Sequence, residues 1–188
     1  MNVSISDLSH IFIQSLSGGS GIYIDATAGN GYDTLFIAKM LKDDGFLYSF
    51  DISKKAVNNT EKLLFDNDIK SDNIKIINDS HENVDRYLID KKINAAMFNL
   101  GYLPNSDKIA VTKAQSTICA LEKILNMLAD KGVVTICSYI GHDNGEEERA
   151  LSSYLLAFDK KAYEISKTEM MGRPSAPVLY LIIKKEAI

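Results

Sequence analysis

The sequence predicts an α/β fold in which helices cover both faces of a mostly parallel sheet, and three observations lead to it. Short apolar runs rich in β-branched residues alternate along the chain with segments whose apolar side chains recur at helical spacing. A glycine-bearing turn joins the first apolar run to the helical segment after it. The last two predicted strands have no helix between them, so we expect an antiparallel hairpin at one edge of the sheet.

The first part of the chain predicts a leading helix and then a strand–helix–strand unit. Residues 3–16 are predicted to be helical because their apolar side chains form a stripe: Val3, Leu8, Ile11, Phe12 and Leu16. A glycine- and serine-rich run ends this helix. Apolar runs at 22–25 and 46–51 predict strands, and residues 33–42 between them have helical spacing.

The middle of the chain repeats this alternation. Ser53 is a good N-cap for a helix that runs to about residue 66. Apolar runs predict strands at 73–78 and 93–100, with a short helix at 81–89 between them.

The last third begins with a long helix, predicted at 112–129 from its inward-facing residues Ile118, Leu121, Ile124, Leu125 and Leu128. A strand at 133–139, a helix at 145–158 and two closing strands at 162–171 and 178–184 follow. Seven strands that end in a hairpin are typical of the Rossmann-like class I methyltransferase fold rather than of dehydrogenases, which is an analogy at the level of the fold.

Length and composition indicate an ordinary globular protein. The chain has 188 residues, 46% of them apolar and 24% charged, which fits a single domain over residues 1–188 whose first 17 residues are the leading helix. We expect no membrane span, since no stretch approaches 18 apolar residues. The N-terminus lacks the basic start of a signal peptide, so we expect a cytoplasmic protein.

The net charge and the two cysteines exclude few functions. The net charge of −4 argues only weakly against a nucleic-acid partner, because binding depends on the local surface. Cys119 and Cys137 lack the spacing of a metal site and stand in apolar runs, so we expect buried free thiols and no metal.

The turn after the first strand is the first candidate site. In parallel sheets, ligands bind at the carboxyl ends of the strands. Residues 25–34 read Asp-Ala-Thr-Ala-Gly-Asn-Gly-Tyr-Asp-Thr, which lacks the third glycine of the dinucleotide fingerprint and therefore favours a ligand without a pyrophosphate, such as S-adenosylmethionine. Either Asp25 or Asp33 can meet the ammonium of that cofactor, and backbone N–H groups at the helix start can meet its carboxylate. The cofactor candidates here are Asp25, Thr27, Gly29, Asn30, Gly31, Asp33 and Thr34. The alternative is a structural turn with Asp33 or Thr34 as N-cap.

The ends of the next two strands supply the remaining cofactor candidates. Asp51, followed by Ile52, can accept hydrogen bonds from two ribose hydroxyls; the alternative is a cap for the next helix, a role that Ser53 already offers. Asp79 can accept from the adenine amino group and the N–H of Ser80 can serve a ring nitrogen, or the two residues cap the next helix. For His81 we expect contact with the cofactor rather than catalysis.

The end of the fourth strand is the candidate site for the methyl acceptor. Asn99-Leu100-Gly101-Tyr102 resembles the Asn/Asp-Pro-Pro-Tyr motif of amino-group methyltransferases without its prolines. In that motif the Asn oxygen and the next carbonyl accept hydrogen bonds from a neutral amine, and the Tyr ring packs on the target. The alternative is a buried strand followed by a turn. After the fifth strand, Tyr139 and His142 are candidate substrate contacts, with a surface loop as the alternative for His142.

Several segments together resemble one family. Residues 25–34, Ser80-His81-Glu82, 98–104 and Gly141-His142 are similar to the YtqB/MnmM family of class I methyltransferases, in the same order and spacing over nearly the whole chain. The resemblance implies an enzyme, long labelled an rRNA methylase, that methylates the amine of 5-aminomethyl-(2-thio)uridine at the tRNA wobble position. The donor would be S-adenosylmethionine and the products the 5-methylaminomethyl nucleoside and S-adenosylhomocysteine.

The resemblance also implies roles for individual residues. Asn99 and the Leu100 carbonyl would aim the amine, Tyr102 would pack on the uracil, and Tyr139 or His142 would hold the substrate, with no strong general base. Arg173, a candidate substrate contact together with Gly101, opens a segment loosely similar to the family's connection before the last strand. Ile140 departs from the family pattern, because we expect Pro there.

The resemblance implies two partners: the tRNA anticodon region, and a second copy of this chain in a homodimer. The long apolar helix or the edge hairpin would form the interface of the homodimer. Two alternatives stay open at this point: methylation of rRNA or of a small-molecule amine, and a non-catalytic nucleoside- or RNA-binding module.

Overall fold

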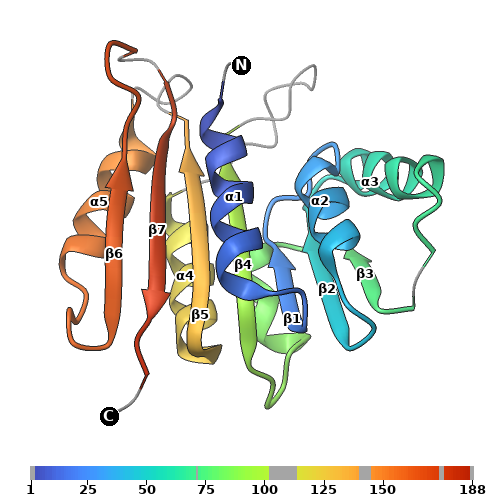
Figure 1. Cartoon of the computed structure of the whole chain (residues 1–188). Coiled ribbons are helices and arrows are strands. Elements are labelled where there is room, and N and C mark those ends of the chain that lie inside the picture. The colour runs from blue at the N-terminus through green and yellow to red at the C-terminus, as the bar shows by residue number, and fades with distance from the viewer. Residues whose placement is uncertain (1–2, 71, 102–113, 140–144, 174–175, 187–188) are drawn as a thin grey trace.

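The computed structural model describes residues 3–70, 72–101, 114–139, 145–173 and 176–186, and these residues build a seven-stranded sheet with helices on both sides (Figure 1). The strand order is β3-β2-β1-β4-β5-β7-β6. The pairs from β3 to β5 are parallel, whereas β7 is antiparallel to both β5 and β6. The predicted α/β fold with an antiparallel edge is therefore confirmed.

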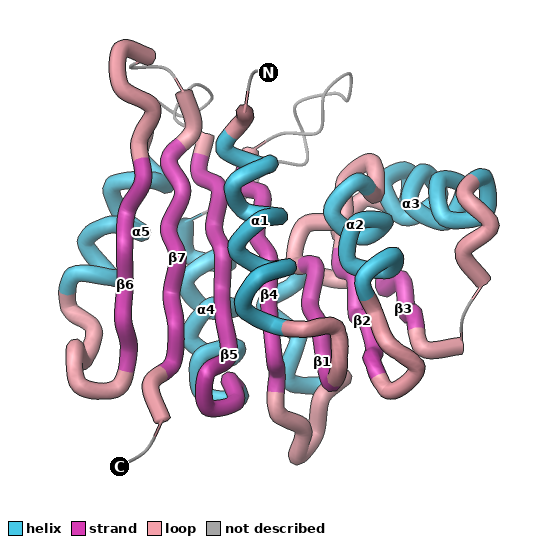
Figure 2. Tube along the Cα trace, in the orientation of Figure 1, coloured by secondary structure: helices cyan, strands magenta, loops and turns pink. Residues whose placement is uncertain are grey.

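The described elements follow the predicted order (Figure 2). They are α1 (Ile5–Ser17), β1 (Gly21–Asp25), α2 (Tyr32–Met40), β2 (Gly45–Phe50), α3 (Lys54–Asp66), β3 (Ile74–Ile77), the 3-10 helix η1 (His81–Arg86), β4 (Ile93–Leu100), α4 (Ala114–Met127), β5 (Leu128–Ser138), α5 (Glu146–Leu156), β6 (Tyr163–Thr168) and β7 (Val178–Lys184).

Most boundaries lie within a few residues of the prediction, but β5 begins five residues earlier than expected, at Leu128 rather than 133. Leu128 pairs with Ile93, and after a register shift Val133 pairs with Ala95. Leu128 is fully buried, so the chain enters the sheet at this residue and bulges before it continues as a regular strand. The helix predicted at 81–89 is a shorter 3-10 helix.

Two apolar layers lie on the two faces of the sheet. One face packs against α4, α5 and η1. On the other face, Ile13 of α1 and Ile37 of α2 pack on strand residues that include Tyr23, Leu47 and Met97. Because side chains alternate along a strand, the positions two residues after Tyr23, Leu47 and Met97 also point toward α1 and α2. Asp25, Ser49 and Asn99 occupy those positions.

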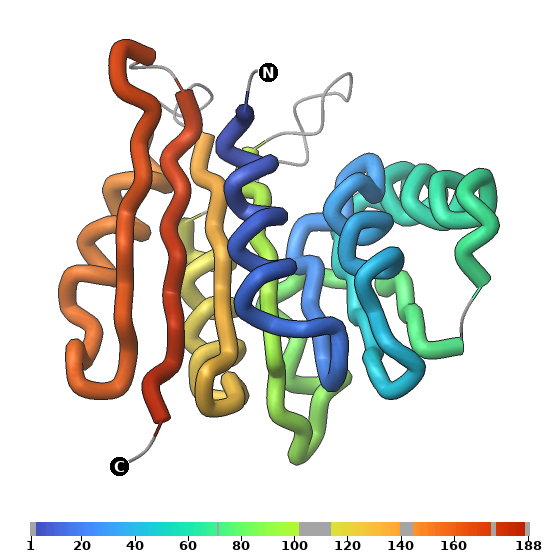
Figure 3. The backbone as a smooth tube through the Cα atoms, in the orientation of Figure 1, coloured from blue at the N-terminus to red at the C-terminus, as the bar shows by residue number. Residues whose placement is uncertain are grey.

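Helix α1 is held across β4 and β5 by polar contacts as well as apolar ones. Its N-terminus is closed by a capping box between Ser4 and Asp7. The Ser9 hydroxyl donates to Thr135 Oγ1 of β5 over 2.8 Å. At its other end, the Tyr23 hydroxyl donates to the Ser17 carbonyl over 2.8 Å. The helix begins at the carboxyl end of β4 and β5 and runs down the sheet, so its first turns stand at the edge where ligands bind (Figure 3).

Among the described residues, every helix falls short of the length and apolarity that crossing a bilayer requires.

Candidate active site

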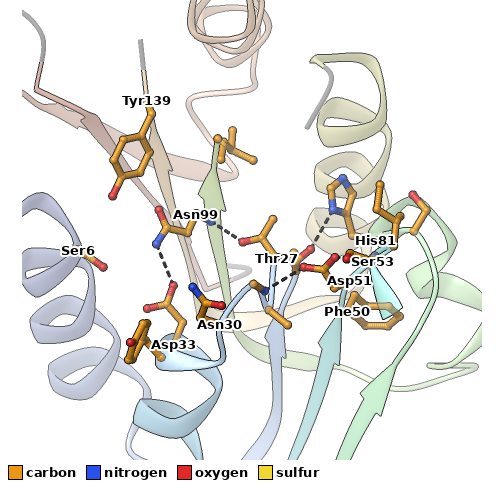
Figure 4. A pocket seen from close by; sticks show the side chains of 18 of the residues that line it. Ser6, Thr27, Asn30, Asp33, Phe50, Asp51, Ser53, His81, Asn99 and Tyr139 are labelled. Carbon is orange, nitrogen blue, oxygen red and sulfur yellow. Dashed lines mark hydrogen bonds between the residues drawn. The ribbon is translucent and has the colours of Figure 1, made fainter. Parts of the chain in front are cut away.

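A cavity of about 620 Å³ opens at the carboxyl ends of the parallel strands (Figure 4). Its wall combines the turn between β1 and α2 with the ends of β2, β3, β4 and β5 and the first turns of α1. This volume falls within the usual range for a small-molecule site. Asp51, His81 and Asn99, which the sequence assigned to three separate strand ends, therefore share one cavity.

Asp25 lies behind the cavity wall rather than on it. Its side chain has no exposed surface, and its carboxylate accepts hydrogen bonds from the Thr27 N–H at 3.0 Å and the Thr34 hydroxyl at 2.6 Å. Thr34 Oγ1 lies 2.7 Å from Ser49 Oγ of β2. This buried network fixes the turn, so the structure gives Asp25 and Thr34 no direct access to a ligand.

The environment of Asp25 favours its protonated form. Burial, with the nearby charge of Asp33 as the second cause, raises the pKa of Asp25 to about 7, although the hydrogen bonds from Thr34 and Thr27 oppose this.

The glycines of the turn allow the chain to pass close to α3. Gly31 has φ +86°, and a Cβ there would lie 2.9 Å from Thr60 Cα. Gly29, with φ 57°, donates its N–H to Asp51 Oδ2 over 2.9 Å. Gly29 and Asn30 line the cavity, whereas Gly31 lies behind them. Only glycine suits position 31, because a side chain would be both strained and in collision.

Asp51 connects the turn to the end of β2 and faces the cavity. Its Oδ1 accepts the Ser53 N–H at 2.8 Å, and its Oδ2 accepts that of Gly29. Ser53, rather than Asp51, is the N-cap of α3. A carboxylate has about four acceptor positions, so Asp51 keeps capacity for two further donors. Ile52 lines the cavity beside it and is largely exposed.

Asp79 and Ser80 line the cavity and also cap η1. Asp79 accepts from the Ser80 N–H, Asn83 Nδ2 and the Tyr87 hydroxyl at 2.7–2.9 Å, and these bonds, led by that from Asn83, lower its pKa despite some burial. Ser80 is the N-cap of η1. The local contacts match the capping alternative, while the position in the cavity leaves the cofactor role open.

His81 faces the cavity in a defined tautomer. Its Nδ1 lies 2.9 Å from the Ala26 carbonyl oxygen, which can only accept, so Nδ1 carries the proton. Burial lowers the pKa of His81, and the ring is therefore neutral. Its Nε2 is buried without a hydrogen-bond partner among the described residues.

Asn99 stands at the end of β4 with both its main chain and its side chain fixed. Its N–H donates to Thr27 Oγ1 over 2.7 Å, and its Nδ2 donates to Asp33 Oδ2 over 3.3 Å. Leu100 and Gly101 continue this wall, with Tyr139 opposite. The pKa of Tyr139 is raised by burial.

Helix α1 contributes a part of the cavity that the sequence analysis missed: Ser6, Asp7 and His10. His10 Nε2 lies 2.6 Å from Asp33 Oδ1, and its ring stacks on Phe36 at 3.9 Å and 3°. The available signal was three polar residues on one side of a helix whose other side is buried.

Three further predicted site residues lie outside the described residues or away from the cavity. Tyr102 and His142 fall outside the described residues. Arg173 is exposed and away from the cavity wall. Across the described part of the chain, the side chains of His, Cys, Asp and Glu form no group arranged to hold a metal ion.

Comparisons with known proteins agree on one family. A family model described as "Putative rRNA methylase" matches residues 47–184. A protein of Arabidopsis thaliana named "tRNA (mnm(5)s(2)U34)-methyltransferase, chloroplastic" is 31% identical over 191 residues, covering 96% of this chain and 69% of that protein.

Two solved structures are also similar over nearly their whole length. The "putative rRNA-methylase" of Clostridium thermocellum is 35% identical, with a TM-score of 0.92 over 98% of this chain and 99% of that one. A "putative methyltransferase" of Streptococcus mutans, solved in complex with SAH, is 32% identical, with a TM-score of 0.87 over 98% and 99% of the two chains.

The burial of Asp25 predicts a specific pH dependence of stability. Its pKa rises from 3.8 in the unfolded chain to about 7 in the folded one. The resulting stabilisation is complete below pH 3.8 and is lost as the pH rises to about 7, because the folded chain keeps a proton that the unfolded chain releases. The expected slope is ~1.4 kcal/mol per pH unit at most. Urea unfolding from pH 5 to 8 should show this slope in the wild type and a flatter profile in Asp25→Asn; parallel profiles would contradict the assignment.

Proposed function

Because the chain belongs to the YtqB/MnmM family of S-adenosylmethionine-dependent methyltransferases, the family of the matching rRNA methylase model, we propose that it methylates the primary amine of 5-aminomethyl-(2-thio)uridine at the tRNA wobble position. The donor in this proposal is S-adenosylmethionine, and the partner is the anticodon region of tRNA. One observation carries the proposal: Asp51 and Asn99 line the same cavity. Asp51 is an acid suited to bind ribose hydroxyls, and Asn99 offers an acceptor suited to an amine.

The residues of the cavity fit the proposed cofactor. Asp51 has acceptor capacity left for the two ribose hydroxyls, and the turn at Gly29 and Asn30 brings the backbone close to the cavity. On the adenine side stand Ser80 and His81, whose buried Nε2 is an acceptor that a ligand donor can satisfy. The cofactor, when bound, supplies a methyl group already activated on a sulfonium.

The task of the protein is then to orient an uncharged amine. An alkylammonium has no lone pair to attack with, so the reacting nitrogen must be neutral. In our proposal Asn99 Oδ1 and the Leu100 carbonyl accept its two N–H groups, which leaves the lone pair directed at the methyl group. A partly desolvated cavity also favours the neutral amine.

Nucleoside analysis of tRNA tests the substrate directly. In tRNA from a strain lacking the gene, mass spectrometry should show loss of 5-methylaminomethyl-(2-thio)uridine and accumulation of its aminomethyl precursor. The purified protein with S-adenosylmethionine should restore the product in that tRNA. An unchanged tRNA profile with a missing methyl group in rRNA, or cofactor binding without turnover on tRNA, would refute the proposal in favour of rRNA methylation or a binding module.

Removing the Asp51 carboxylate should abolish cofactor binding. Asp51→Ala loses the acceptor for the ribose and the clamp on the Gly29 N–H, and two hydrogen bonds to a charged group correspond to an affinity loss of about 100-fold or more. Calorimetry with S-adenosylhomocysteine measures this loss. Asp66→Asn, on the exposed side of α3, is the matched control, and wild-type affinity in Asp51→Ala would refute the assignment.

Asn99→Ala should separate turnover from binding. The variant keeps the backbone bond to Thr27 but loses the amide oxygen, so turnover should fall about 100-fold or more while cofactor affinity is retained. Asn126→Ala, exposed near the end of α4, should behave as wild type. Single-turnover methylation of precursor tRNA is the measurement, and a wild-type rate in Asn99→Ala would exclude the role.

A further inference from the structure

We propose that Asp33, held in place by His10, is the positioning residue that keeps the amide oxygen of Asn99 turned toward the substrate amine. The inference rests on the proposed function and deepens it, because it identifies what orients the amine-binding group. It is carried by a chain of contacts from three elements: His10 of α1, Asp33 of α2 and Asn99 of β4.

The contact between Asp33 and Asn99 determines which way the amide faces. A carboxylate offers only acceptors, so the atom of the Asn99 amide that lies 3.3 Å from Asp33 Oδ2 is the NH2 nitrogen. The amide oxygen therefore points away from Asp33, toward the side of the cavity where Tyr139 stands (Figure 4). Asn99 thus presents an acceptor to the cavity.

This orientation matters for the proposed chemistry. The terminal torsion of an Asn side chain is broad and roughly two-fold, so an unrestrained amide can turn over with little cost. A turned amide would present its NH2 group to the substrate and donate to the nitrogen lone pair. That lone pair would then no longer be free to form the new N–C bond. The Asp33 carboxylate opposes the turned form because it would then face the amide oxygen.

Asp33 is itself constrained by His10 of α1. Its other oxygen, Oδ1, lies 2.6 Å from His10 Nε2, and the side chain is only 8% exposed. The His10 ring stacks on Phe36, one turn along α2 from Asp33. Because His10 engages Oδ1, Oδ2 is left to accept from Asn99. The position of α1 therefore helps to determine the orientation of the Asn99 amide.

Three variants test this role through different atoms. Asp33→Leu keeps a side chain that branches at Cγ and removes the acceptor. Asp33→Asn keeps a carbonyl oxygen that can accept from Asn99, while its own NH2 can donate to His10 Nε2. His10→Phe keeps the stack on Phe36 and removes the bond to Asp33. The role predicts that kcat on precursor tRNA falls about 10- to 100-fold in Asp33→Leu and by a smaller factor in His10→Phe. Asp33→Asn should recover most of the loss, and affinity for S-adenosylhomocysteine should change little in all three.

The control variant and the measurement of cofactor affinity distinguish this positioning role from a role in cofactor binding. Asp66→Asn should match the wild type. A loss of cofactor affinity in proportion to kcat would overturn the inference and place Asp33 on the cofactor ammonium. Wild-type kcat in Asp33→Leu, or no recovery in Asp33→Asn, would also overturn it. If Asp33→Leu does not fold, as judged by circular dichroism, an unchanged kcat in His10→Phe overturns it equally.

A spectroscopic readout is independent of the substrate assignment. The side-chain NH2 signals of Asn99, identified in 1H–15N spectra by their absence in Asn99→Ala, should shift in Asp33→Leu and stay in place in Asp66→Asn. Unmoved signals in Asp33→Leu would contradict the contact. If the wild type fails to methylate any tRNA, the proposed function fails, while these signals still decide whether Asp33 holds the amide.

Discussion

The geometry of the site depends on one buried carboxyl group, that of Asp25. It accepts from the backbone of Thr27 and the hydroxyl of Thr34, and so closes the turn between β1 and α2 upon itself. The Thr27 hydroxyl in turn accepts the Asn99 N–H, which joins the turn to the end of β4. Because a buried polar group without partners is costly, each of these bonds resists displacement. Asp25, which lies behind the cavity wall, thus fixes the distance between the turn after β1 and the end of β4.

The same face of the sheet serves stability at one end of the strands and chemistry at the other. Tyr23, Leu47 and Met97 pack on α1 and α2 in an apolar layer. Two residues further along, that face carries Asp25 and Asn99, and the layer becomes polar. The two-residue period of a strand is sufficient for this division, since it returns every second side chain to the same helices. Helix α1 spans both zones, with Ile13 in the apolar layer and His10 at the cavity.

The sequence predicted the order of helices and strands along the chain well, but it did not predict which side chains meet in the folded structure. Local patterns are sufficient to find a glycine turn, or an acid at a strand end such as Asp51, because both are properties of adjacent residues. They do not say whether Asp25 faces a ligand or is buried behind the turn, since the pleat and the packing of α2 decide that. The sequence of an amphipathic helix also does not specify which face of the sheet the helix covers. The hydrogen bond between His10 and Asp33 could therefore not be predicted from the sequence. The early start of β5 likewise depends on pairing with Ile93, a distant residue.

If the proposed function holds, the charge of the cavity explains why an amide rather than a carboxylate stands at position 99. Asp7, Asp33, Asp51 and Asp79 all line it, and negative charge of this kind favours a sulfonium cofactor. It would equally favour the protonated form of the proposed substrate amine, which cannot react. A carboxylate in direct contact with the amine would raise the amine's pKa by pairing with the ammonium, whereas a neutral carbonyl oxygen accepts the N–H groups with a much weaker preference for the charged form. The oxygens of Asp33 are engaged by His10 and by the Asn99 amide. In the proposed arrangement, this carboxylate therefore stays one contact away from the amine and orients the amide that binds it.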